Sequence, residues 1–107
     1  MKYKKKNDTN FWKVTRSFLH EYMPVVRNLS DKSVEAYKQS LNSYLAFLKE
    51  ELAIENAGVC FEFFDHNNIK KYIVWLKEKK NYFPKTIYLK LTAIKSFLKY
   101  SSDERHR

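Results

Sequence analysis

The scarcity of residues that break helices constrains this chain more than any other feature. Its 107 residues include one glycine and two prolines. A sheet-rich fold needs many tight turns built from such residues, whereas long helices exclude them. Because 44% of the residues are hydrophobic, the chain can bury one core. We therefore predict a single all-α domain that folds as a compact bundle.

Apolar residues recur every three or four positions in two segments of the first half. The first predicted helix begins near Asn10, a good N-cap residue, and ends at Pro24. The second is capped by Ser30 and keeps one apolar face as far as Leu52. The residues between Leu52 and the next helix are expected to form an irregular connection.

The second half repeats this organisation. The third predicted helix begins at Asp65, and Pro84 occupies the first position of a fourth, which runs to about Ser101. The expected core face of the third helix consists of Ile69, Tyr72, Ile73 and Leu76. The expected core face of the fourth consists of Ile87, Leu91, Ile94 and Leu98. Four helices without a strand complete the bundle.

Residues 29–48 and 82–101 align with each other at an offset of 53 positions. Each segment has a start signal, then a lysine, a hydroxyl residue, a β-branched residue and an amphipathic helix. Any two amphipathic helices would match at their apolar positions. The match of Lys32-Ser33 with Lys85-Thr86 is less expected by chance, and it is a weak indication of an internal repeat.

The net charge of +9 is distributed unevenly along the chain. Residues 1–27 carry a net charge of +5, residues 28–65 carry −4, and residues 66–102 carry +8. Such segregation indicates a basic face directed at a polyanion such as nucleic acid. A lysine-rich surface that is merely solvated is the alternative.

Catalysis requires convergent polar groups, and the sequence offers none at convincing spacing. The three histidines are scattered, and no group of His, Cys, Asp or Glu has the spacing of metal ligands. Cys60 lies in an apolar stretch and is expected to be a buried thiol, not a nucleophile. No glycine-rich phosphate loop is present. We expect neither metal nor cofactor, and no enzymatic activity in this fragment.

A single cysteine excludes an internal disulfide and fits a reducing compartment. No apolar run approaches the length of a membrane span, and the basic start is too polar for a signal peptide. We therefore expect a cytoplasmic protein that makes no membrane contact.

The fourth predicted helix carries a polar stripe beside its core face. Lysines can contact phosphates, while hydroxyl and aromatic groups can reach base edges. An ordinary solvated face would mix glutamate with lysine, and this predicted helix has no carboxylate. The candidate DNA contacts on it are Lys85, Tyr88, Thr92, Lys95 and Lys99. On the second helix, the candidates are Lys32, Ser33 and Lys38, with Gln39 and Asn42 as exposed amides that could pair with adenine.

Two segments together resemble a known family. Residues 29–37 (LSDKSVEAY), followed by Leu41, resemble the pattern L-[ST]-x-x-T-[IV]-x-x-Y-x-x-x-L. Residues 84–100 (PKTIYLKLTAIKSFLKY) resemble T-[IV]-x-x-x-[LI]-[SA]-[AT]-[LI]-[RK]-x-F with its flanks. Both patterns are signatures of the N-terminal SAM-like core-binding domain of tyrosine recombinases (phage integrases). The resemblance covers residues 10–102.

This resemblance implies a four-helix SAM-like bundle that forms half of a clamp on a recombination site. The second and fourth helices would cross the major groove, opposite the catalytic domain of the same chain. Other protomers would pair through this domain in a synaptic complex, and the parent protein would act in DNA integration or recombination, associated with the nucleoid. Carried over by position, the contacts to double-stranded DNA are Lys32, Ser33, Lys38, Lys85, Thr86 and Lys95. We expect a flexible basic arm at 1–9, the core-binding domain at 10–102, and the start of the interdomain linker at 103–107.

Two departures of the chain from the family pattern matter. Ser33 stands where threonine is usual, and Phe83 stands where a serine usually caps the fourth helix, so that cap is in doubt. The catalytic arginine, lysine, His-x-x-Arg and tyrosine motifs of the family occur nowhere in these residues. None of the eight tyrosines is therefore assigned as a nucleophile.

Two other interpretations remain open. In a helix-turn-helix regulator, the third and fourth helices would cross at about 90–120° and the fourth would enter the groove by its N-terminus. A basic stripe along the whole fourth helix favours the clamp domain. The other interpretation is a helical protein–protein adaptor with incidental charge, whose binding would not respond to salt. The N-terminal lysines could contact phosphates or remain free.

Overall fold

The computed structural model describes residues 9–105. Helix α1 (Thr9–Ser17) continues directly into a π-helical segment, η1 (Phe18–Val26), and is followed by the long helix α2 (Asp31–Leu52). Two short 3-10 turns, η2 (Asn56–Gly58) and η3 (Phe61–Phe64), lead to α3 (His66–Glu78) and then to the second long helix, α4 (Pro84–Arg105). The described residues contain no strand. The prediction of an all-α, four-helix bundle is confirmed.

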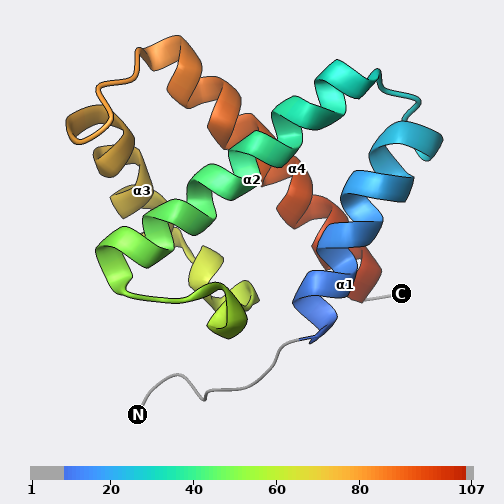
Figure 1. Cartoon of the computed structure of the whole chain (residues 1–107), viewed down its shortest axis with the longest axis horizontal. Helices are drawn as coiled ribbons and strands as arrows, with labels where there is room; N and C mark the ends of the chain where they lie inside the picture. The colour runs from blue at the N-terminus through green and yellow to red at the C-terminus, as the bar shows by residue number, and fades with distance from the viewer. Residues whose placement is uncertain (1–8, 106–107) are drawn as a thin grey trace.

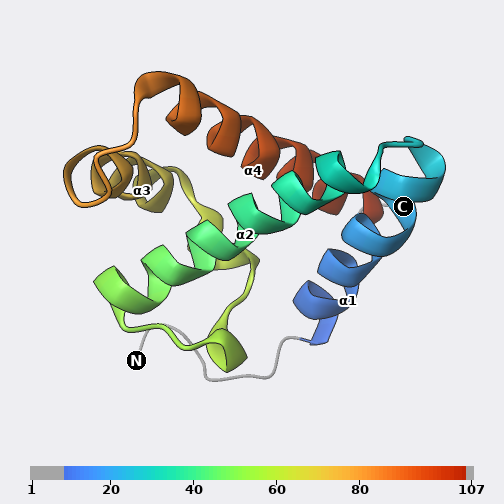
Figure 2. The same ribbon diagram turned by 45° about the horizontal axis from the view of Figure 1, so that its top comes forward.

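The two long helices cross each other in the middle of the molecule (Figure 1). α2 lies in front of α4 in this view, and the tilted view separates them into two layers (Figure 2). α1 flanks the crossing on the side of the C-terminal half of α4, and α3 flanks it on the other side. The smallest dimension, 19 Å between Cα extremes, fits two layers of helices about 10 Å in diameter.

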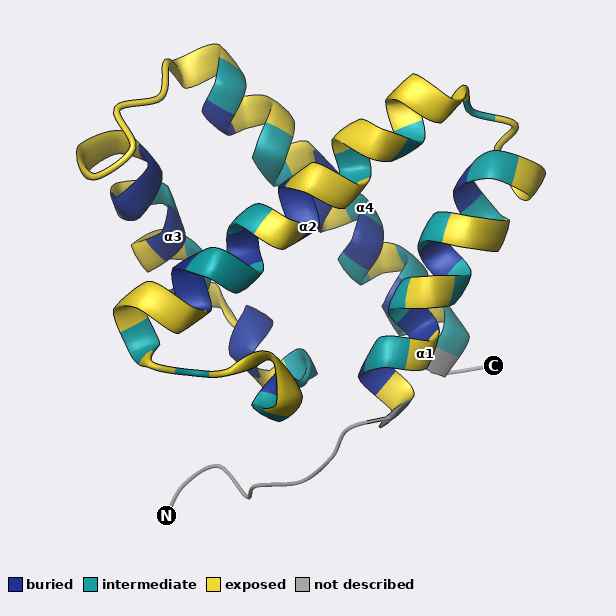
Figure 3. Cartoon of the chain, viewed as in Figure 1, coloured by how far each residue is buried: buried dark blue, intermediate teal, exposed yellow. Residues whose placement is uncertain are grey.

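Aromatic side chains make up half of the buried hydrophobic residues, and Phe97 of α4 lies among them. Its ring centroid is 5.9 Å from that of Phe11 in α1 and 5.4 Å from that of Phe18 in η1. It also lies 5.9 Å from Phe64 in η3, which stacks on Tyr44 of α2 at 4.4 Å. The Phe97 side chain thus packs α4 against α1 and η1 and against η3 in the connection between α2 and α3. The buried faces of all four helices point toward this centre (Figure 3).

Several boundaries and core positions differ from the sequence prediction. Pro24 does not end the first helix but lies inside η1, where the N–H of Arg27 donates to the carbonyl of Tyr22 five residues back at 2.8 Å. A proline ring clashes with the carbonyl four residues earlier in an α-helix, and the wider π-helical turn relieves this clash. The helix also begins at Thr9, so Asn10 is its second residue and not its cap.

α4 continues to Arg105, four residues past the predicted end near Ser101. Ser101 is fully buried, and its hydroxyl donates to the carbonyl of Phe97 at 2.8 Å, so this residue lies within the helix and not at its end. Nζ of Lys99 also lies 3.8 Å from Oδ2 of Asp103, one turn further along the helix. The helix therefore includes carboxylates that its predicted span lacked. The proposed domain boundaries, including the linker from residue 103, stay predictions.

The buried face of α4 is turned relative to the predicted face. Leu91 and Leu98 are only half-buried, whereas Ala93 and Phe97 are buried. At 100° per residue, the centre of the face moves by about 60° toward Phe97. The cause is tertiary, because the aromatic rings of α1, η1 and η3 pack against this side of the helix. In α3, Trp75 joins the core in a similar way.

The weak sequence repeat corresponds to a structural duplication. The helices that precede α2 and α4 end in the same turn, in which Asn28 and Asn81 adopt left-handed backbone with φ of 53° and 54°. Each turn is closed by a hydrogen bond from a backbone N–H to the helical carbonyl six residues earlier. The two bonds are Leu29 N–H to Met23 O, 3.0 Å, and Tyr82 N–H to Leu76 O, 3.1 Å.

The same offset of 53 residues relates the core positions of α2 and α4. The four equivalent buried pairs are Ser40 with Ala93, Leu41 with Ile94, Tyr44 with Phe97, and Leu48 with Ser101. The molecule is thus two helix–turn–helix halves related by an approximate two-fold axis. The axis is vertical in Figure 1, where it exchanges α2 with α4 and α1 with α3.

Phe97→Ala should cost about 3–5 kcal/mol in the free energy of unfolding, because it empties a site enclosed by four aromatic rings. Leu91→Ala should cost clearly less, since Leu91 is only half-buried. Urea unfolding followed by circular dichroism measures both. Equal losses would show that the register of α4 described here is wrong.

Two buried tyrosines should make the fold sensitive to alkali. The hydroxyl of Tyr44 donates to the carbonyl of Phe63 at 2.7 Å, and that of Tyr72 donates to Oγ of Ser43 at 2.9 Å. Burial raises the pKa of Tyr72 to about 12 and raises the pKa of Tyr44 still further, with the charge of Asp65 adding to the second effect. In the unfolded chain, both phenols titrate near pH 10.

The two phenols should therefore leave the free energy of unfolding unchanged below pH 10. As the pH rises from there toward about 12, the free energy of unfolding should fall, because only the unfolded chain ionises these phenols readily. Tyr72→Phe should cost about 1 kcal/mol at pH 8 through the lost hydrogen bond. It should also lose less stability than the parent between pH 8 and pH 11, as measured by the urea midpoint. An unchanged pH dependence would contradict the assignment to Tyr72.

Candidate nucleic-acid interface

The approximate two-fold axis brings two of the predicted contact pairs to one edge of the molecule. Lys32 and Ser33 lie in the first turn of α2, and Lys85 and Thr86 lie in the first turn of α4. Both turns emerge at the upper edge in Figure 1. The offset of 53 residues relates Lys32 to Lys85 and Ser33 to Thr86, so the pairs occupy equivalent positions. We call these four residues the N-terminal edge.

The turn at the start of α2 is closed by its own cap, as predicted. Oγ of Ser30 accepts a hydrogen bond from the N–H of Ser33 at 3.2 Å, and the two hydroxyls also contact each other at 3.2 Å. The Lys32 side chain is exposed, and no carboxylate of the described residues lies within ion-pair distance of it. This ammonium group is available to a ligand.

The equivalent turn of α4 lacks a side-chain cap. Phe83 occupies the position of Ser30, and its carbonyl accepts the first helical hydrogen bond from Ile87 at 3.1 Å, but its ring cannot accept one. Pro84 has no N–H to satisfy. Lys85 is exposed and without an ion-pair partner among residues 9–105. The positive end of the helix dipole and a free lysine therefore coincide here.

The other predicted residues of α4 follow its outward face. Tyr88, Thr92, Lys95 and Lys99 are all exposed, and at 100° per residue their stripe lies roughly opposite the buried face. The hydroxyl of Thr92 donates to the carbonyl of Tyr88 at 2.9 Å and keeps its lone pairs free. Because α2 and α4 pack against each other, this stripe points away from α2, and only its N-terminal end joins the edge.

Lys38 lies apart from the N-terminal edge. It lines a hollow of about 290 Å³ between α2 and η1, together with Leu19 and Pro24 and the carboxylates of Asp31 and Glu35. These acids reduce the local positive potential. The Gln39 amide, which could have read a base, instead donates to Glu35 at 3.4 Å. The structure therefore groups the predicted residues into an edge, a stripe and one separate lysine.

Sequence reasoning missed several residues at the α4 end of the edge. Lys90 is partly buried, and its ammonium lies over the ring of Tyr82, 5.5 Å from the centroid; burial lowers the pKa of Lys90. Lys80 lies over the Trp75 ring in the same manner, at 5.0 Å. Phe83 is 78% exposed. Its departure from the family's usual serine was the one available signal.

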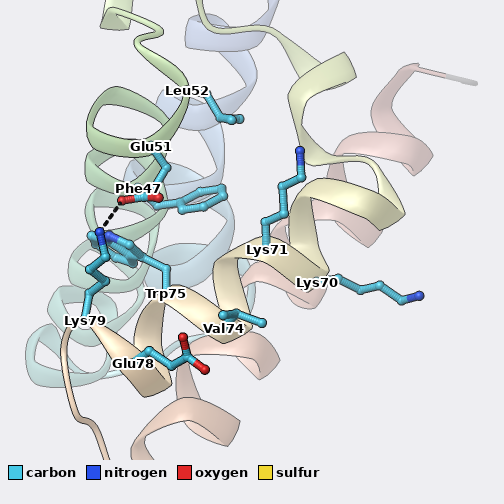
Figure 4. A pocket seen from close by; sticks show the side chains of 9 residues that line it. All are labelled: Phe47, Glu51, Leu52, Lys70, Lys71, Val74, Trp75, Glu78 and Lys79. Atoms are coloured by element: carbon cyan, nitrogen blue, oxygen red, sulfur yellow. Dashed lines mark hydrogen bonds and ion pairs between the residues drawn. The ribbon is translucent and has the colours of Figure 1, made fainter.

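A hollow of about 520 Å³ lies between the C-terminal end of α2 and α3 (Figure 4). Phe47 and Trp75 line it, and Lys79 closes one side through an ion pair with Glu51 at 3.4 Å. Lys70 and Lys71 extend in different directions, so their charges do not converge on one ligand (Figure 4). The described residues contain no cluster of metal-binding side chains, and none of their helices could cross a membrane. The N-terminal edge is thus the stronger candidate site.

Comparison with known proteins identifies the family to which this chain belongs. Residues 16–105 match the family model described as phage integrase, N-terminal SAM-like domain. The match spans most of the sequence, and the chain belongs to this family. The family resemblance drawn from residues 29–37 and 84–100 is confirmed. Neither a curated protein nor a solved structure gave a significant match.

Proposed function

We propose that this chain is the DNA-binding, core-binding domain of a tyrosine recombinase, and that it holds duplex DNA by the N-terminal edge. The observation that supports this most is the duplication. It presents two equivalent turns, each with one lysine and one hydroxyl residue, on the same side of the molecule (Figure 1). Phosphate groups follow both strands of a duplex, and paired cationic turns fit the two backbones that border a groove.

The charge distribution supports the same assignment. Between residues 79 and 102 the chain has six lysines and no carboxylate, and this segment forms the α4 side of the edge. Lys95 and Lys99 extend the positive surface along the outward face of α4, although Lys99 shares its charge with Asp103. Lys38 stays in the proposed set as a weaker contact because of its neighbouring carboxylates.

The partners and the location follow from this proposal. The DNA partner is double-stranded and, in the parent recombinase, would be a recombination site. The catalytic domain of the parent would hold the other side of the duplex, and other protomers would join in a synaptic complex. A domain with this role would work beside the DNA, in the cytoplasm and associated with the nucleoid.

The isolated domain should bind duplex DNA weakly, with little sequence preference and a strong dependence on salt. About five lysine–phosphate contacts give a slope of log K against log salt of roughly −4 to −5. Fluorescence anisotropy with a labelled duplex measures it. A slope near zero would favour the protein–protein adaptor and remove the DNA assignment.

Lys32→Ala and Lys85→Ala should have similar effects, because their positions are equivalent. Each should reduce the magnitude of the salt slope by about one and change the free energy of unfolding by about 0.5 kcal/mol or less. Lys95→Ala, three turns from the edge, should have a smaller effect. Lys49→Ala is the matched control, since Lys49 lies at the far end of α2 beside Glu55. If Lys49→Ala weakens binding as much as Lys85→Ala, attraction is general and the edge is not the site.

The chain should neither cut nor join DNA, with or without a divalent metal, because the family's catalytic motifs are absent from its sequence. Incubation with a nicked duplex followed by denaturing electrophoresis should show no covalent protein–DNA adduct. An adduct that disappears on mutation of one tyrosine would overturn this assignment.

A further inference from the structure

The hollow between the C-terminal end of α2 and α3, which we call the α2–α3 hollow, is lined by a polar group that the fold leaves unsatisfied. Trp75 is 3% exposed, and its indole Nε1 has no hydrogen-bond partner among residues 9–105. Nearly all buried polar side-chain atoms in folded proteins have such a partner. The carboxylate of Glu51, which also lines the hollow, is paired instead with Lys79 at 3.4 Å. The indole N–H is therefore a donor that a ligand could satisfy.

Apolar surface makes up the middle of the α2–α3 hollow. The rings of Phe47 and Trp75 line it with their centroids 5.7 Å apart, and Val74 is 50% exposed beside them. α3 contributes two adjacent rows of side chains, which are Lys70, Val74 and Glu78 in one row and Lys71, Trp75 and Lys79 in the other. The volume of about 520 Å³ falls within the range of about 300–1,000 Å³ that ligand-binding cavities occupy.

Unpaired charges lie at both ends of these rows. Lys70 and Lys71 are exposed, and neither has an ion-pair partner among the described residues. They extend in different directions, so they suit two carboxylates spaced along a peptide better than one small anion (Figure 4). Glu78, at the other end, is also without an ion-pair partner in residues 9–105. The ion pair between Lys79 and Glu51 is exposed, and such pairs oppose displacement only weakly.

The duplication supplies a comparison, because the other half of the molecule has an equivalent hollow. It measures about 360 Å³ and lies between η1 and the C-terminal end of α4, where Tyr22 and Tyr100 take the positions of Trp75 and Phe47. The hydroxyls of Tyr100 and Ser17 contact each other there at 2.6 Å, and none of the described residues that line this hollow is a lysine. The unsatisfied indole and the free lysines of the α2–α3 hollow are therefore not requirements of the architecture.

We propose that the α2–α3 hollow is a docking site for an acidic, amphipathic helix of a partner protein. A carboxylate would supply the acceptor that the Trp75 indole lacks, and further carboxylates would pair with Lys70 and Lys71. Apolar side chains of the same helix would cover Val74 and the two rings, as in other complexes that seat a helix in a groove. The hollow lies along α3, whereas the N-terminal edge is formed by the first turns of α2 and α4 (Figure 1). A partner could thus be held while the edge binds DNA, and the docking itself does not depend on DNA.

A synthetic peptide tests the chemistry of the partner. The probe is a helical peptide of leucine, phenylalanine, alanine and glutamate, with its apolar residues on one face. The control peptide has glutamine in place of every glutamate. Isothermal titration calorimetry with the parent chain should show binding of the glutamate peptide and about tenfold weaker binding of the glutamine peptide, because the charged contacts are lost. Equal binding of the two peptides, or no binding of the glutamate peptide, would overturn the proposal.

Val74→Glu tests the location. It places a carboxylate in the middle of the hollow, as Glu21 does in the equivalent one, and at a half-exposed position that should leave the circular dichroism spectrum unchanged. The new charge repels the peptide and pairs with Lys70 one turn away, so binding of the glutamate peptide should fall at least tenfold. Val25→Glu is the matched control, at a valine of η1 that is 72% exposed, and should bind the peptide as the parent does. Equal binding by both variants would show that the hollow is not the site.

The two tryptophans of the chain provide a spectroscopic readout of the contact itself. In a proton–nitrogen correlation spectrum, the indole N–H signal of Trp75 should move downfield when the glutamate peptide is added, because the N–H gains an acceptor. The signal of Trp12, in α1, should stay in place. Trp12→Phe assigns the two signals. A larger shift at Trp12 than at Trp75 would contradict the assignment.

Three further outcomes separate this docking site from the other surfaces of the molecule. Displacement of the peptide by an unlabelled duplex would mean that the peptide binds the N-terminal edge as a polyanion, and would contradict the proposal. A parent that is dimeric by sedimentation equilibrium and becomes monomeric as Val74→Glu would assign the hollow to a second copy of the chain, which also contradicts it. Peptide binding by a chain that binds no duplex would support the docking site and remove the proposed DNA-binding function.

Discussion

Helices α2 and α4 cross near their middles (Figure 1), and each buries a small side chain in its middle turns, Ser40 in α2 and Ala93 in α4. Small residues let two helices approach closely, and the larger side chains on either side then enclose the contact. The rest of the molecule depends on this crossing. α1 and α3 fill the two spaces beside it, and the free N-terminal ends of the crossed pair form the edge that we assign to DNA.

The aromatic content of the chain has a structural explanation in this arrangement. Crossed helices diverge from their contact point and leave wedge-shaped gaps that aliphatic side chains fill poorly. Phe97 and Tyr44, equivalent by the duplication, extend into these gaps and meet the rings of the flanking segments. The hydroxyl of Tyr44 reaches a backbone carbonyl, so its burial leaves no polar atom without a partner.

The sequence predicted the fold class, the starts of α2, α3 and α4, and the equivalence of Lys32 and Lys85, because these follow from local signals such as caps, prolines and periodicity. It predicted the core face of α4 less well. Leu91 and Phe97 are both apolar, and only the packing of η1 and η3 decides which is enclosed. Pro24 predicts a helix end, and the π-helical turn that contains it instead has no clear sequence signal. The sequence could not divide the predicted contacts between the N-terminal edge and the stripe on α4, because that division depends on how α2 and α4 cross.

The crossing has a further consequence for how such a domain could change. The distance between Lys32 and Lys85 depends on the angle between α2 and α4, and the volumes of the side chains buried along the two helices, Ser40 and Ala93 among them, constrain that angle. Ser40 lies eight residues after Lys32, and Ala93 lies eight residues after Lys85. One added methyl group at either buried position would act over this length of helix and would move the two lysines relative to each other. Affinity for a given groove width could thus be tuned from the interior, while every residue that we propose to contact DNA stays the same.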